Sequence, residues 1–173
     1  LQQVPNQPLH GGLREDDLIA FTFDKYLTKQ GDDWPLLLPM VESARRAMDT
    51  VSTVMTEKAG AAIKRFVISG ASKRGWTTWL TAAADKRVIA IAPMVIDMLN
   101  MQPQMEQQIK SYGKFSGQID PYSKLKIQAR LTTPRGKQLA AIVDPYAYRQ
   151  NLTLPKLMVL GTNDPYWTVD ASS

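Results

Sequence analysis

A serine between a strand-like run and a helix-compatible segment is the feature of this sequence that most suggests chemistry. The run Arg65–Ser69 is rich in β-branched and aromatic residues, the turn Gly70-Ala71-Ser72 follows, and an apolar segment begins directly after it. Such a junction is typical of a nucleophile elbow, in which a tight turn exposes the hydroxyl at the end of a sheet. The free N–H groups and the positive dipole end of the next helix would face a developing oxyanion. The pattern predicts a serine hydrolase with Ser72 as its nucleophile.

The pattern departs from the usual Gly-x-Ser-x-Gly elbow at its second glycine. Arg74 occupies that position, and Gly75 comes one residue later. The alternative interpretation is structural: a strand ends in a turn of small residues, and Ser72 serves only as the N-cap of the helix. The local pattern leaves both interpretations open, so the other residues of a catalytic site must decide between them.

Two aspartates are candidates for the acid of a catalytic triad. In the hydrolase fold the chain order is serine, acid, histidine. Asp164, in Gly-Thr-Asn-Asp-Pro-Tyr after the last strand-like run, is the predicted acid, and Asp97, directly after the run that follows the elbow, is the alternative. Either aspartate could instead cap a helix or close a turn. The backbone N–H of Lys73 is the predicted oxyanion donor, and its ammonium would add positive charge.

The histidine that should act as the base is the part of the triad that this sequence lacks. A serine is a poor nucleophile until a base accepts its proton. His10 is the one histidine of the chain, and it lies upstream of Ser72 in a glycine-rich turn. We expect His10 to be a solvated loop residue and these residues alone to show no triad-dependent hydrolysis.

Strands that alternate with helices are predicted to position these residues. Unbroken apolar runs predict strands, and apolar side chains at helical spacing predict helices. The alternation indicates an α/β protein with a parallel sheet and helices on both faces, folded as one domain over residues 1–173. Ligand sites in such sheets lie beyond the carboxyl ends of the strands, where Ser72, Asp97 and Asp164 all fall. The expected strands are 1–4, 65–69, 88–96 and 157–160, the expected helices are 13–27, 38–58 and 75–84, and 98–150 should form short helices and loops.

Composition excludes several classes of site and partner. The formal net charge is +5, but the basic residues are scattered and do not interleave with aromatics, so we expect no nucleic-acid partner. The absence of cysteine excludes disulfides and thiolate metal sites, and a single histidine gives no zinc pattern. We therefore expect no metal and no cofactor. No apolar run reaches the roughly 20 residues that span a bilayer, and the oligomeric state stays open.

Short segments spread along nearly the whole chain form a set more specific than the elbow alone. They are Gln3–Leu9, Asp17–Ala20, Trp34–Met40, Gly70–Trp76, Val143–Tyr146 and Pro155–Leu157. The set resembles the PhoPQ-activated pathogenicity-related protein family, a bacterial branch of the α/β-hydrolase superfamily. The displaced glycine of the elbow is also a feature of that family. Glucuronoyl esterases, which have a basic residue after the serine and a glycine three places on, are the next nearest comparison.

The resemblance implies a secreted or periplasmic hydrolase that cleaves a small ester or peptide, in a family associated with virulence and antimicrobial-peptide resistance. It implies that residues 1–173 are a partial domain, with the oxyanion loop upstream and the catalytic histidine downstream of Asp164. A strand between those expected at 1–4 and 65–69 would be absent, which would leave unpaired edges or a new strand order. The alternatives are a non-catalytic binding protein, an inactive truncated remnant and an esterase similar to glucuronoyl esterases.

Overall fold

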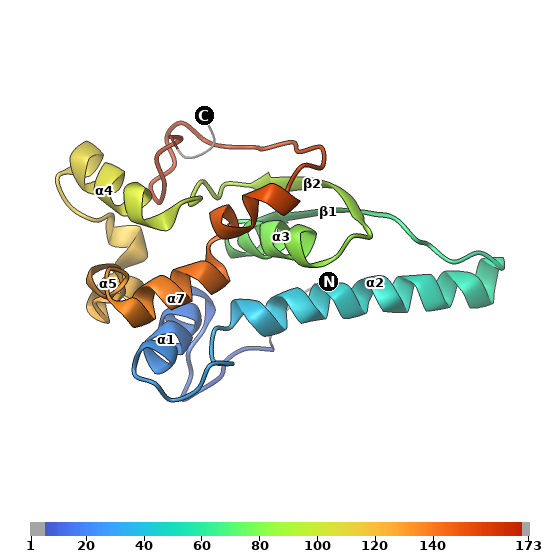
Figure 1. The fold of residues 1–173 in the computed structure, drawn as a ribbon, viewed down its shortest axis with the longest axis horizontal. Coiled ribbons are helices and arrows are strands. Elements are labelled where there is room, and N and C mark those ends of the chain that lie inside the picture. The colour runs from blue at the N-terminus through green and yellow to red at the C-terminus, as the bar shows by residue number, and fades with distance from the viewer. Residues whose placement is uncertain (1–5, 171–173) are drawn as a thin grey trace.

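The computed structural model describes residues 6–170, which form a mixed α/β fold around a small parallel sheet (Figure 1). Helices α1 (Glu15–Leu27) and α2 (Leu37–Ala59) precede the sheet, whose central unit is β1 (Phe66–Ala71), α3 (Lys73–Ala84) and β2 (Val88–Met94). The elements that follow are α4 (Met101–Tyr112), η1 (Gly117–Ile119), α5 (Asp120–Lys124), α6 (Ile127–Arg130), α7 (Pro134–Val143) and η2 (Pro145–Asn151). These short helices confirm the prediction for residues 98–150, whereas the strand predicted at 1–4 lies outside the described residues.

β1 and β2 pair in parallel, so their carboxyl ends reach the same edge of the sheet. Ala71, the last residue of β1, pairs with Met94, the last residue of β2. Residues 155–159 run beside β2 through isolated parallel bridges, one of which joins Met94 to Val159. The strand predicted at 157–160 is therefore present only as bridges, because its pairing with β2 is too intermittent to form a regular ladder. Within residues 6–170 the sheet has two strands, and the larger hydrolase sheet stays a prediction.

The two faces of the sheet differ in how well they are covered. Along β1 the side chains alternate, with Ile68 packed against the core and Val67 67% exposed. Leu157, in the bridged segment beside β2, is also 67% exposed. Purely parallel sheets usually have helices on both faces. Among the described residues, the side chains on the face opposite α3 are exposed along β1 and half-buried along β2. The expected helices on both faces are therefore observed on one face.

The two helices before the sheet form where the sequence predicts them, but the apolar spacing predicted along α2 is buried only in its first half. α1 buries Leu18 and Phe23 in the core, and α2 buries Met40 and Met48 in its first half. The second half of α2 extends past the body of the molecule, with Val51 45% exposed (Figure 1). No helix among residues 6–170 combines the length and the apolar character needed to cross a membrane.

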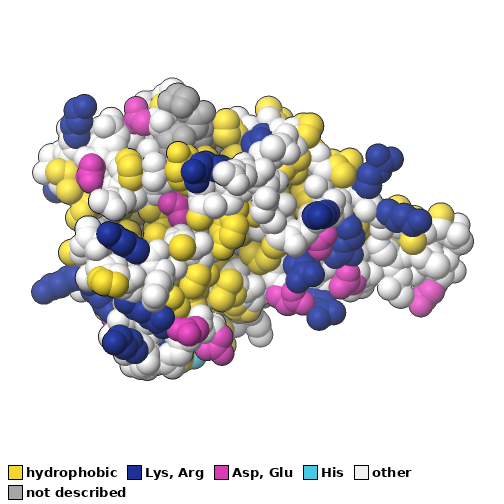
Figure 2. Space-filling model, viewed as in Figure 1, with side chains coloured by type: hydrophobic (Ala, Val, Ile, Leu, Met, Phe, Trp, Pro, Cys, Tyr) yellow, Lys and Arg dark blue, Asp and Glu magenta, His cyan; other side chains and the backbone are white. Residues whose placement is uncertain are grey.

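Ion pairs connect α2 to the turn between α3 and β2. Arg87 lies 2.7 Å from Asp85 and 2.6 Å from Asp49, and Arg45 lies 3.4 Å from Asp85. The hydrogen bond from Arg87 lowers the pKa of Asp85 to about 2. Figure 2 shows charged side chains of both signs along α2, beside a central area of hydrophobic side chains. This network fixes α2 against the central unit from the side opposite the elbow.

Asp144 joins the C-terminal helices through one buried carboxylate. It is 7% exposed and accepts the N–H groups of Asn100 at 3.1 Å and Met101 at 2.7 Å, where α4 begins. The same carboxylate accepts the Tyr146 N–H at 2.9 Å, where η2 begins. Burial raises the pKa of Asp144 above its usual value. A single side chain therefore caps two helix starts that are far apart in the sequence.

Asp144→Ala is expected to lower the free energy of unfolding by about 2 kcal/mol, because two helix starts each lose a cap worth roughly 1 kcal/mol. Equilibrium unfolding in denaturant measures the change. The control is Asp120→Ala, which removes an exposed carboxylate from the first turn of α5 and should cost less than about 0.5 kcal/mol. Equal losses in the two variants would contradict the capping role.

Candidate active site

Ser72 forms the sharp turn that the sequence predicts between strand and helix. β1 ends at Ala71, α3 begins at Lys73, and Ser72 between them has φ 53° and ψ −126°. A positive φ is strained for a residue with a side chain, and such strain gathers at functional sites. The Ser72 N–H donates to the Met94 carbonyl at 2.8 Å, and its carbonyl accepts the Trp76 N–H at 3.0 Å. The turn is therefore held by both β2 and α3.

The side chain of Ser72 does not cap α3. In the part of the chain that the structure describes, no capping hydrogen bond joins its hydroxyl to the first turn of the helix. A serine N-cap normally has an extended backbone and accepts a hydrogen bond from the second or third helical N–H. The interpretation of Ser72 as an N-cap is therefore wrong for this conformation.

Gly70 and Gly75 allow the end of β1 and the start of α3 to approach each other closely. A Cβ on Gly70 would lie 2.5 Å from the Arg74 carbonyl oxygen. A Cβ on Gly75 would lie 2.5 Å from Cγ2 of Ile96 and 2.9 Å from the Gly70 carbonyl oxygen. Position 74 has room for a side chain that reaches α1. The helix approaches the strands most closely at position 75, three residues after Ser72. The glycine is therefore required there, and not at position 74 as in the usual elbow.

The first turn of α3 places backbone donors without an intrahelical acceptor beside the serine. The Trp76 N–H makes the first hydrogen bond of the helix, to the Ser72 carbonyl. The N–H groups of Lys73 and Arg74 therefore have no acceptor within the helix, and the positive end of its dipole lies there. This arrangement suits an oxyanion donor, and the assignment of that role to Lys73 stays a prediction.

Acidic residues of α1 bind the charged groups of Lys73 and Arg74. The Lys73 ammonium lies 3.2 Å from Glu15 and 3.0 Å from Asp16, and Arg74 binds Glu15 through two nitrogens at 2.5 and 3.0 Å. The hydrogen bond from Arg74 lowers the pKa of Glu15 to about 2. These carboxylates neutralise the ammonium that the sequence prediction assigned to the oxyanion. The sequence reasoning missed this cluster, whose signal is an acidic helix start combined with two cations directly after the serine.

The two predicted acids follow the carboxyl ends of β2 and of the segment bridged to it. Asp97 comes after β2 and is 1% exposed. Asp164 comes after the bridge at Val159, and its Oδ1 accepts the N–H groups of Tyr166 at 2.7 Å and Trp167 at 3.3 Å. The Asp164 carboxylate therefore closes a turn. In chain order both residues follow segments that end at the edge of the sheet occupied by Ser72, and the role of either as the catalytic acid stays a prediction.

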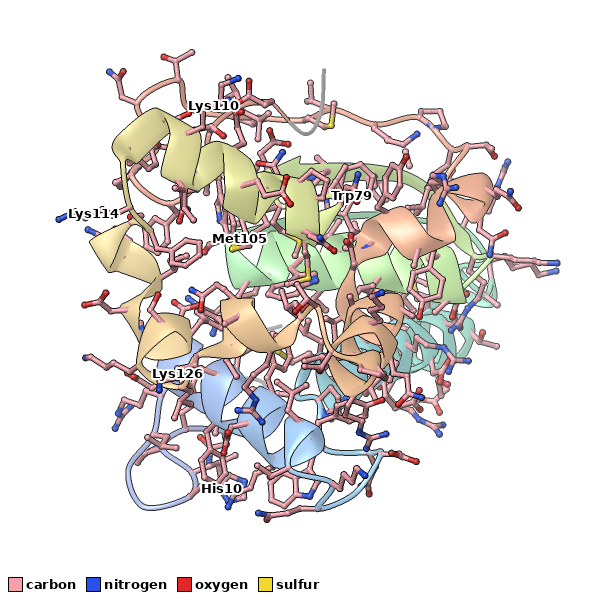
Figure 3. The ribbon with its side chains drawn as sticks, turned by 60° about the vertical axis from the view of Figure 1, so that its left-hand side comes forward. His10, Trp79, Met105, Lys110, Lys114 and Lys126 are labelled. Atoms are coloured by element: carbon pink, nitrogen blue, oxygen red, sulfur yellow. The ribbon has the colours of Figure 1, made fainter. Side chains whose placement is uncertain are left out.

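His10 lies in the loop before α1, as expected for a solvated loop histidine. Its ring is exposed and packs beside Phe21 and Trp34, with centroid distances of 5.0 and 5.6 Å. Figure 3 shows His10 at the lower edge of the molecule, on the side of α1 away from Trp79 and the rest of α3. The structure does not bring this histidine to the elbow.

Residues 1–173 match the family described as PhoPQ-activated pathogenicity-related protein. The chain belongs to this family. It is also 38% identical over 177 residues to the autocrine proliferation repressor protein A of Dictyostelium discoideum, a match covering 99% of this chain and 36% of that protein. The chain thus spans about a third of the length of that relative. No solved structure matches significantly.

Membership of the PhoPQ-activated pathogenicity-related family confirms the resemblance to that family, and its assignment to the α/β-hydrolase superfamily stays a prediction. The relative from Dictyostelium discoideum shows that similar chains are not confined to bacteria.

A hollow of about 380 Å³ lies between α2, β1 and α3, and Ser69 and Arg74 line it whereas Ser72 does not. Residues 6–170 contain no group of three His, Asp or Glu side chains that could hold a metal ion.

Gly75→Ala is expected to lower the free energy of unfolding by about 1–3 kcal/mol, the usual cost of an extra methyl in a site without room for it. The added Cβ would collide with Ile96 and with the Gly70 carbonyl. Thermal and denaturant unfolding measure the loss. Gly117→Ala is the matched control, because nothing lies within 4 Å of its Cβ position. A Gly75 variant as stable as the Gly117 variant would contradict the close approach.

Proposed function

We propose that this family member carries the nucleophile of a serine hydrolase of the α/β-hydrolase type, with Ser72 in that role. The observation behind the proposal is the backbone of Ser72, a strained strand-to-helix turn whose hydroxyl does not cap the helix. A serine kept only as a cap would adopt the unstrained extended conformation. The strained conformation is the one that exposes a nucleophile above the helix N-terminus.

The proposed reaction is acyl transfer in two steps. Oγ of Ser72 attacks the acyl carbon of an ester or amide, its proton passes to a base, and the oxyanion accepts a hydrogen bond from the Lys73 N–H. The base then protonates the departing alcohol or amine, and water hydrolyses the acyl-enzyme by the reverse route. Because Glu15 and Asp16 bind the Lys73 ammonium, backbone N–H groups are the donors in this proposal. The reaction requires no cofactor and no metal.

The acid and the base are assigned on chain order and position. We assign Asp164 as the carboxylate that orients the base, with Asp97 as the alternative, because both follow strand ends at the edge that Ser72 occupies. The base is proposed to be a histidine of a longer polypeptide, because His10 packs against Phe21 and Trp34 instead. The matched relative is much longer than the segment it shares with this chain.

The proposed substrate is a small ester or a peptide, met in the periplasm or outside the cell. The family description refers to pathogenicity, and the name of the Dictyostelium protein refers to repression of proliferation. Neither name specifies a reaction. A role in virulence through antimicrobial-peptide resistance would involve cationic peptides, and a chain of net charge +5 does not attract these at long range.

A second candidate is a hydrolase-fold protein that binds a ligand without cleaving it, either as a functional binding module or as an inactive remnant. The position of His10, in the loop before α1 and away from α3, favours this alternative (Figure 3). A fluorophosphonate probe distinguishes the candidates, because it modifies an activated serine and leaves an unactivated one untouched. Labelling that disappears in Ser72→Ala supports the hydrolase, and no labelling of the longer polypeptide favours the binding protein.

In the longer polypeptide, Asp164→Asn should reduce turnover about ten-thousandfold, because an asparagine keeps the shape of the acid but loses the support for the charged base. The free energy of unfolding should change little. Asp120→Asn is the control, since Asp120 is exposed on α5. Full turnover in Asp164→Asn together with loss in Asp97→Asn would transfer the acid role to Asp97.

The 173-residue chain alone should show no triad-dependent hydrolysis of activated esters. Without a base, oxyanion donors leave a residual acceleration of about a thousandfold to ten-thousandfold over water at most. The measurement compares ester turnover by the chain with turnover by its Ser72→Ala and His10→Ala variants. If both variants abolish turnover, His10 is the base and the assignment of an external histidine is wrong.

A further inference from the structure

The first turn of α3 carries two cations at the end of the helix where cations are unfavourable. Lys73 and Arg74 are the first two residues of α3, and the first turn contains no acidic residue. Because the N-terminal end of a helix dipole is positive, these side chains destabilise the helix start unless anions compensate them. The strained turn at Ser72 directly precedes them. The elbow therefore depends on negative charge supplied by another element.

Glu15 and Asp16, at the start of α1, supply this negative charge. Glu15 contacts both cations, and Asp16 contacts Lys73 at 3.0 Å and accepts the Tyr122 hydroxyl at 3.1 Å. Gln7 binds Glu15 twice, with its amide donating to the carboxylate at 2.7 Å and its Oε1 accepting the Glu15 N–H at 2.5 Å. The anions are themselves held in place by the loop before α1 and by α5.

We propose that Glu15 is the positioning residue of the elbow. By binding Arg74 and Lys73 together, it holds the first turn of α3, and with it the Ser72 hydroxyl and the Lys73 N–H, in the arrangement that acyl transfer requires. This role rests on the function proposed above. Glu15 acts through the two cations and does not touch the reacting atoms. Without its charge, Asp16 alone would face two cations at the positive end of the helix.

The ion pair between Arg74 and Glu15 is partly exposed to solvent, which would weaken its contribution to holding the turn. The side chains of Arg74 and Glu15 are 41% and 44% exposed, and exposed ion pairs commonly contribute little. Bidentate arginine–carboxylate pairs and charge networks are the exceptions. Glu15 meets both conditions, because it binds Arg74 through two nitrogens and also contacts Lys73 and Gln7.

Hydrogen exchange of the 173-residue chain tests whether Glu15 holds the turn. In Glu15→Gln, the hydrogen-bonded backbone amides of Ser72 and Trp76 should exchange about tenfold faster, because local opening becomes easier. Asp24→Asn is the matched control: it removes another carboxylate of α1, which binds Arg130 at 2.6 Å, and should leave these amides unchanged. The double variant Glu15→Gln/Arg74→Gln should exchange more slowly than Glu15→Gln, because the uncompensated cation is gone. Unchanged exchange in Glu15→Gln, or equal changes in the Asp24 variant, would overturn the proposal.

Reactivity of the longer polypeptide tests whether holding the turn positions the nucleophile. Glu15→Gln should slow phosphonylation of Ser72 by a fluorophosphonate about tenfold, and Asp24→Asn should leave the rate unchanged. An unchanged rate in Glu15→Gln despite faster exchange would overturn the positioning role. If Ser72 of the unaltered polypeptide does not react at all, the proposed hydrolase function fails, and the exchange result alone decides whether Glu15 holds the elbow.

Discussion

The close contact between the start of α3 and the carboxyl ends of β1 and β2 is the constraint on which the rest of this structure depends. It exists because Gly70 and Gly75 carry no Cβ where backbone atoms would lie 2.5–2.9 Å away. The contact places Trp76 directly beneath the turn, where its indole donates to the Val143 carbonyl. This hydrogen bond connects the end of α7, at Val143, to the helix that packs on the strands. Any side chain at these glycines would separate the layers that build the core.

Charge at the elbow is balanced locally, although the chain as a whole is basic. The net charge of +5 describes scattered side chains, whereas Lys73 and Arg74 are matched by Glu15 and Asp16 within salt-bridge distance. Surface charges farther away are screened over about 10 Å at ordinary ionic strength. The dipole and N–H groups of α3 therefore lie beside cations that are paired at short range, and the net charge of the chain bears only on the long-range approach of a ligand.

The sequence predicted those parts of the fold that local patterns encode. α1, α2 and the β1–α3–β2 unit follow from apolar spacing and from the small residues of the turn, and their bounds lie within a few residues of the expected ones. The bridged segment at 155–159 was predicted as a strand, because its apolar run does not reveal how few backbone groups pair with β2. The double cap at Asp144 and the contacts of Glu15 were not predicted, because they join distant segments: Asn100 is 44 residues from Asp144, and Arg74 is 59 residues from Glu15.

A residue in a strained turn costs roughly 1–3 kcal/mol relative to a relaxed backbone. Such a turn persists only where contacts with the surrounding structure offset that cost. Ser72 meets this condition through contacts that all lie within the described residues: the Met94 carbonyl, the Trp76 N–H and the close packing at Gly75. The backbone geometry of the proposed nucleophile and of its proposed oxyanion donors is therefore set by residues 70–94 of the fold, and Glu15 and Asp16 of α1 compensate the two cations beside it. Orientation of a base has no such local source, because it requires side chains from separate strand ends to converge. A chain of this kind can therefore preserve the shape of a catalytic elbow independently of whether it contains the residues that activate it.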